Sequence, residues 1–188
     1  MIYLASSSPR RRTLLKKASL RFKIIRPLYQ EVHRETGSAS ALTRRHALGK
    51  ALSVVANVQD GIVLGSDTVV VCGGHILGKP RSMKAAERML LSLEGRWHSV
   101  VSAVALLKIR EGVVQKKKVF TENTRVYIRK SDIHVRRAYL KRIRPLDKAG
   151  AYAAQAAGKG AVQKIQGSFT NVVGLPMEKL QTALRMLR

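Results

Sequence analysis

Residues 62–71 constrain the fold of this chain more than any other stretch. They are apolar and rich in β-branched side chains, except at Gly65-Ser66-Asp67-Thr68 in the middle. Such a run predicts a buried strand. Because a buried carboxylate is costly unless it is paired, hydrogen-bonded or bound to a metal, Asp67 is the first candidate functional residue. The alternative is a strand that ends in a turn at Asp67, although the apolar run resumes directly after Thr68.

The start of the chain combines a short apolar segment with a cluster of cations. Residues 2–5 predict a buried strand, and Ser8 before Pro9 predicts the N-cap and first residue of a helix. A helix N-terminus exposes N–H groups and a partial positive charge, which favour anions. The serines and arginines of residues 6–12 therefore form a cradle suited to a triphosphate. The alternative is a capped helix with ordinary surface arginines.

Three further segments are weaker candidates. Gly78-Lys79-Pro80 places a lysine in a stiff turn, where it can meet a phosphate as a point charge. Residues 147–155 are rich in small side chains and end at Gln155, whose amide can pair with the edge of a base. Residues 167–176 predict a turn before the last helix. Packing of small residues explains the second segment equally well, and an ordinary turn or loop explains the other two.

Strand and helix patterns alternate along the chain, which predicts an α/β or α+β domain with a mixed sheet. The predicted strands cover residues 2–5, 22–25, 62–71, 100–108, 113–128 and 161–165. Helices are predicted from Pro9, over 39–57, from a cap at Ser82 to 93, from a cap at Ser131 to 143, and after Pro176. No internal repeat or low-complexity linker divides the sequence, so we expect one domain over residues 1–188.

Composition limits the partners and the compartment. The 36 lysines and arginines against 11 acidic residues give a net charge of +25, spread over both halves of the chain. This charge attracts polyanions such as nucleotides or nucleic acid, although a solvated basic surface explains it as well. No apolar run reaches the ~18 residues that span a bilayer, and the five histidines show no metal-binding spacing. With Cys72 as the single cysteine, we expect a cytoplasmic protein without a membrane association.

Taken together, the candidate segments resemble the Maf family of nucleotide pyrophosphatases, also described as septum-formation inhibitors. The resemblance is carried in order by residues 4–11, 65–70, 78–80, 86–100, 147–155 and 165–176. It implies an elongated mixed sheet flanked by helices, similar to inosine-triphosphate pyrophosphatases, with two lobes around a central cleft. The implied activity is hydrolysis of dTTP or UTP, and of related modified pyrimidine nucleotides, to the monophosphate and pyrophosphate, a house-cleaning function.

The resemblance also implies a role for individual residues. Asp67 matches the proton acceptor of the family. The positions that match base selection are Arg10, Thr68 and Gln155, and those that match phosphate binding are Ser6, Arg11, Lys50 and Lys79. Asp67 and Glu31 would hold a divalent cation, Mg²⁺ or Mn²⁺. A homodimer is a further expectation from the family.

The sequence departs from the family pattern in three ways. The family often carries paired acids where Gln30-Glu31 keeps one, and often an acid where Arg144 precedes Pro145. The net charge of +25 is also unlike the family. Two alternatives therefore stay open: a non-catalytic nucleic-acid-binding protein on the same fold, and an enzyme inactivated by loss of acids. Aromatic residues make up only 5% of the chain, too few for a stacking platform, so nucleic-acid contacts would be weak and non-specific.

Overall fold

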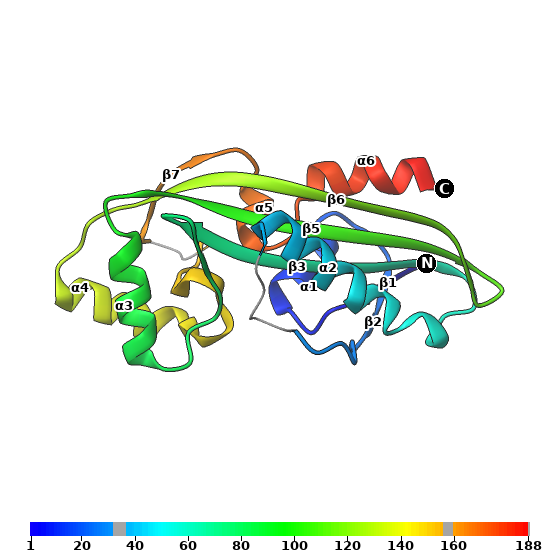
Figure 1. Ribbon diagram of the computed structural model, residues 1–188, viewed down its shortest axis with the longest axis horizontal. Helices are drawn as coiled ribbons and strands as arrows, with labels where there is room; N and C mark the ends of the chain where they lie inside the picture. Colours follow the sequence, from blue (N-terminus) through cyan, green and yellow to red (C-terminus); the bar gives the residue numbers. More distant parts are fainter. Residues whose placement is uncertain (32–36, 156–159, 188) are drawn as a thin grey trace. The chain divides into compact units, whose positions relative to one another are not determined.

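The computed structural model describes residues 1–31, 37–155 and 160–187 (Figure 1). Within them a seven-stranded mixed sheet has the order β2-β1-β3-β5-β6-β7, and β4 also pairs with β3. The strands are β1 Ile2–Ala5, β2 Phe22–Ile25, β3 Gly61–Cys72, β4 His75–Leu77, β5 Trp97–Arg110, β6 Val113–Ile128 and β7 Val162–Gln166. The α-helices are α1 Pro9–Lys17, α2 Ala39–Leu52, α3 Met83–Leu93, α4 Ile133–Ile143, α5 Phe169–Val173 and α6 Met177–Leu187. Short 3₁₀ turns are η1 Val55–Asn57, η2 Pro145–Asp147 and η3 Ala149–Ala151. The predicted mixed α/β class, a sheet flanked by helices, is confirmed.

The chain forms two compact units. The first comprises Met1–Asp67, Ser102–Glu122 and Gly174–Arg188, and the second Thr68–Val101 and Asn123–Val173. Strands β3, β5 and β6 contribute residues to both. Among the described residues, no helix has the length and apolar character needed to cross a membrane.

In the first unit α2 packs on one face of the sheet. Its fully buried Ala47 and Ala51 join a core with small and apolar side chains of β1, β3 and β5. Gly65 of β3 makes this close approach possible, because a Cβ there would lie 2.1 Å from the carbonyl oxygen of Ala47. Helix α6 runs beside β6 (Figure 1), and Lys179 of α6 donates to the carbonyl oxygen of Thr121.

Strand β1 lies between β2 and β3, so the strand order reverses direction at the end of β1. Strand β1 pairs in parallel with β2 on one side and with β3 on the other, and Ala5 lies opposite Gly65. The chain therefore leaves β1 through α1 to one neighbour and later returns to the other. In open α/β sheets, ligands bind at such a switch point, outside the carboxyl ends of the strands. Ser6 and the N-terminus of α1 lie directly after that end of β1.

The second unit has its own core. Helices α3 and α4 lie next to each other (Figure 1), and α3 packs against η3. Leu90 of α3, Leu140 of α4 and Tyr152 after η3 are buried in one apolar cluster with residues of β3, β5 and β6. Strand β7 pairs antiparallel with the end of β6.

Three sequence predictions about helix ends need correction. Ser8 lies at the N-cap of α1 in an extended conformation, but its side chain makes no capping hydrogen bond. Asp132, and not Ser131, caps α4 by accepting from the amide of Val135, because the Ser131 hydroxyl donates to Glu94 instead. The second helix ends at Leu52, five residues before the predicted end, and the 3₁₀ turn η1 follows. The predicted cap at Ser82 is confirmed.

Candidate active site

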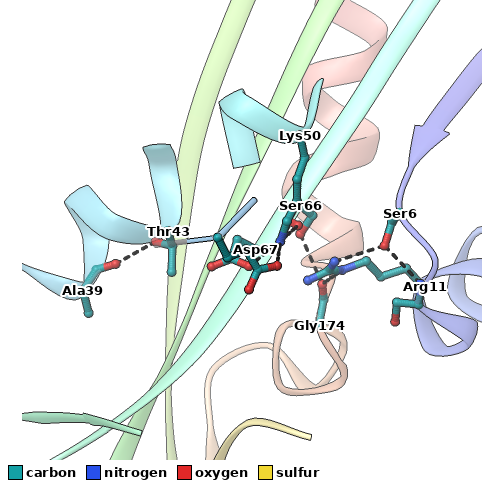
Figure 2. Close-up of polar contacts among 10 residues, drawn as sticks. Ser6, Arg11, Ala39, Thr43, Lys50, Ser66, Asp67 and Gly174 are labelled. Carbon is teal, nitrogen blue, oxygen red and sulfur yellow. Dashed lines mark hydrogen bonds and ion pairs between the residues drawn. The ribbon is translucent and has the colours of Figure 1, made fainter. Parts of the chain in front are cut away.

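Asp67 lies inside β3, where it is only 8% exposed, so the strand does not end in a turn there. Its carboxylate Oδ1 accepts a hydrogen bond from Lys50 Nζ at 2.6 Å (Figure 2). The same nitrogen lies 3.5 Å from the carbonyl oxygen of Ser66. The sequence left open how a buried carboxylate at position 67 is stabilised. The pairing with Lys50 provides this stabilisation by offsetting the cost of burial.

Lys50 also binds a second acid. Its Nζ lies 2.6 Å from Glu31 Oε1 as well, so one buried ammonium group holds two carboxylates. The position of Lys50 follows from the packing of α2 on Gly65. Glu31 lies two residues after Tyr29, whose ring is so close to α2 that a Cβ on Gly49 would come within 2.3 Å of it.

The start of α1 provides a second cationic group. Arg11 Nε donates to the carbonyl oxygen of Gly174 at 2.9 Å, and Arg11 Nη1 donates to Ser6 Oγ at 3.2 Å (Figure 2). Ser6 is 4% exposed, and its hydroxyl also accepts from the amide of Ser8. Ser66 Oγ donates to the same Gly174 carbonyl at 3.3 Å. A single carbonyl thereby joins α1, β3 and the segment before α6.

Electrostatics link these two groups. Burial lowers the pKa of the Arg11 guanidinium, and Arg10 lowers it further, whereas the charges of Asp67 and Glu31 raise it. An arginine remains charged even with a lowered pKa. Arg11 is a half-buried cation at a helix N-terminus, and it interacts electrostatically with two carboxylates. Such a group is suited to an anionic ligand that brings phosphate oxygens and a metal.

The donor set is compatible with a divalent cation. Mg²⁺ is usually bound by one or two carboxylates together with substrate phosphates. Glu31 and Asp67 supply two carboxylates that converge on one cationic group, the Lys50 ammonium. Among the described residues, no three or more histidine, cysteine or acidic side chains gather around a common point. The two acids therefore fit a metal that binds together with phosphate oxygens.

The structure places the predicted site residues in two groups. The first unit brings together Ser6, Arg11, Glu31, Lys50 and Asp67 through the contacts above, and it also contains Arg10. The second unit contains Thr68, Lys79 and Gln155. Thr68 follows Asp67 in β3, and Lys79 and Gln155 are both exposed. Within the second unit, the amide of Gly150 donates to the carbonyl of Gly78 at 3.2 Å, which joins the segments that carry the lysine and the glutamine.

Sequence reasoning missed three residues that contact the candidate site: Gly174, Ser66 and Tyr29. The sequence predicts Gly174 only as part of a turn, and it marks Ser66 only as a neighbour of Asp67. A backbone carbonyl gives no signal of its own in a sequence, because every residue has one. Gly49 is the one sequence feature that could have indicated the contact with Tyr29. It lies inside a predicted helix directly before Lys50, and a glycine there lowers helix stability, so its presence suggests that another group packs closely against it.

Known proteins resemble this chain over nearly its full length. A family model described as "Maf-like protein" matches residues 1–187. A dTTP/UTP pyrophosphatase of Carboxydothermus hydrogenoformans is 41% identical over 98% of this chain and 97% of its own. One from Moorella thermoacetica is 42% identical over 97% and 93%. A solved dITP/XTP pyrophosphatase from Mycobacterium abscessus matches 100% of this chain and 96% of its own length at 18% identity, with a TM-score of 0.46.

Proposed function

Because the chain belongs to the family of Maf-like proteins, we propose that it is a nucleoside triphosphate pyrophosphatase that hydrolyses dTTP and UTP to the monophosphate and pyrophosphate. The observation that carries this proposal is the buried Asp67 carboxylate, paired with Lys50 and coupled electrostatically to Arg11 at the start of α1. A carboxylate next to phosphate-binding cations is the arrangement that hydrolysis of a phosphoanhydride needs.

In the proposed reaction, water attacks the α-phosphorus of the nucleotide. Asp67 accepts a proton from that water as the new P–O bond forms. The bond from the α-phosphorus to the bridging oxygen breaks, and pyrophosphate leaves with the electron pair. Arg11 and Lys50 stabilise the charge that develops on the phosphate oxygens. Ser6 holds Arg11 in place for this task through its hydroxyl.

Glu31 and Asp67 would hold a divalent cation, Mg²⁺ or Mn²⁺. When bound, the cation neutralises negative charge on the phosphate groups. Lys50 keeps the two carboxylates together, because both lie 2.6 Å from its nitrogen. We expect removal of divalent metal with a chelator to abolish pyrophosphate release.

The remaining roles are inferred from the family pattern. Arg10, Thr68 and Gln155 select the base, and Lys79 binds phosphate. A homodimer is inferred on the same ground. A single cysteine, Cys72, suits a reducing compartment such as the cytoplasm.

The decisive test is incubation of the purified chain with dTTP, UTP, CTP and 7-methyl-GTP, with detection of pyrophosphate. We expect release from dTTP and UTP. Asp67→Asn should lower kcat at least about 100-fold, which is the scale of general acid–base catalysis. The fold should survive this change, because Lys50 retains Glu31 as its partner. Near-normal turnover by Asp67→Asn would refute the catalytic role, and a wild-type chain that releases no pyrophosphate from any nucleotide would refute the function.

A further inference from the structure

The backbone next to Gln155 is held by a side chain from another element. Tyr139 of α4 uses one hydroxyl for both polar groups of Ala153: the Ala153 amide donates to Tyr139 Oη at 3.0 Å, and this hydroxyl donates to the Ala153 carbonyl at 3.3 Å. Ala153 lies two residues before Gln155. The backbone of Ala161, on the other side of Gln155, also hydrogen-bonds to the hydroxyl.

The tyrosine is itself rigidly placed. Its side chain is 6% exposed and belongs to the core of the second unit, next to Leu140 and Tyr152. The guanidinium of Arg142 lies 5.8 Å from the ring centroid. Burial raises the pKa of Tyr139, so its hydroxyl stays protonated and remains a donor at neutral pH.

A second contact fixes the neighbouring residue. Tyr152 Oη lies 2.8 Å from His98 Nε2, and the two rings pack edge to face. The chain reaches this point through Gly150, whose φ of +71° and close contact with Val70 exclude a larger residue. The backbone from Gly150 to Ala153 is therefore held at successive points, and Gln155 follows two residues after the last of them.

We infer that Tyr139 is a positioning residue for base selection: its hydroxyl fixes the backbone at Ala153 and thereby sets where the Gln155 amide meets the nucleotide base. This inference rests on the proposed function. An amide discriminates between bases only if its donor and acceptor are held in register with the base edge. The ligand recognised through this device is the pyrimidine edge of a nucleoside triphosphate.

Tyr139→Phe tests the inference, because it removes the hydroxyl and keeps the ring. We expect kcat/KM for UTP to fall about tenfold, mostly through KM, on the scale of one to two hydrogen bonds. The ratio of kcat/KM for UTP to that for CTP should fall with it. Hydrogen exchange at the amides of residues 153–155 should become faster. Tyr127→Phe, which removes a hydroxyl from β6 in the same unit, is the matched control and should change neither quantity.

A double-mutant cycle shows whether Tyr139 acts through the glutamine. In a Gln155→Ala background, Tyr139→Phe should have no further effect on the UTP to CTP ratio, since the group it positions is gone. An active Tyr139→Phe variant with unchanged selectivity, or with unchanged amide exchange, overturns the inference and leaves the proposed function intact. A wild-type chain that hydrolyses neither nucleotide overturns the proposed function, and the inference about selectivity with it.

Discussion

At the scale of the residue, His98 shows how burial fixes a protonation state. It is 4% exposed, and its Nε2 pairs with the hydroxyl of Tyr152. Burial lowers the pKa of His98 to about 4, from an ordinary value of 6.5. The ring is therefore neutral at physiological pH, and it serves the structure around Tyr152 as a hydrogen-bonding partner that carries no charge.

This pKa predicts how stability depends on pH. The unfolded chain takes up a proton at His98 below about pH 6.5, whereas the folded chain does so only near pH 4. Protonation therefore favours unfolding as the pH falls through this window, by up to about 3 kcal/mol. Urea unfolding of wild type and His98→Gln between pH 7 and pH 4 measures the effect. The variant should lose less unfolding free energy on acidification, and equal losses would contradict the assignment.

At the scale of the element, the contact between α2 and β3 determines the geometry around Asp67. A Cβ on Gly65 would lie 2.1 Å from the Ala47 carbonyl oxygen and 2.9 Å from the Ala51 amide. These are backbone atoms, so Gly65→Ala must displace the helix that carries Lys50. We expect a loss of about 1–3 kcal/mol of stability, as for other overpacked cores, together with a large loss of activity.

Thermal unfolding and pyrophosphate release measure the two effects of Gly65→Ala. Gly78→Ala is the control for stability, because a Cβ there meets nothing within 4 Å. Its melting temperature should stay close to that of wild type. A Gly65→Ala variant as stable and active as wild type would show that α2 can shift without cost.

The same contact shows what could and could not be predicted from the sequence. The apolar run around Asp67 predicted its burial, because periodicity and composition report local environment. The resemblance implied Lys50 as a phosphate-binding position, but nothing in the sequence predicted its pairing with Asp67, since that contact joins residues 17 positions apart through a helix packed on a strand. The Ser131 cap was wrong because a tertiary partner, Glu94, competes for the hydroxyl. The contacts of Arg11 and Ser66 with Gly174 depend on a backbone carbonyl, which no side-chain pattern reveals.

Over the whole molecule, the net charge of +25 attracts anions of any kind. Both halves of the sequence share the excess, at net +10 and +15. A field of one sign over the entire chain attracts a triphosphate at long range, and it attracts nucleic acid in the same way. Nucleic-acid binding depends more steeply on salt than triphosphate binding does, because a duplex releases many counterions at once.

We therefore expect weak association with duplex DNA and with RNA, without sequence preference. If about six phosphates are neutralised, affinity should fall about 1000-fold between roughly 50 and 200 mM salt. Fluorescence anisotropy with two labelled duplexes of unrelated sequence measures this directly. An excess of duplex should inhibit UTP hydrolysis at low salt only, because the polyanion competes for the same cations. Binding that prefers one sequence and persists at about 200 mM salt would instead indicate a dedicated nucleic-acid site. Contacts to bases depend less on salt than contacts to phosphates, whose contribution through counterion release is small at that concentration.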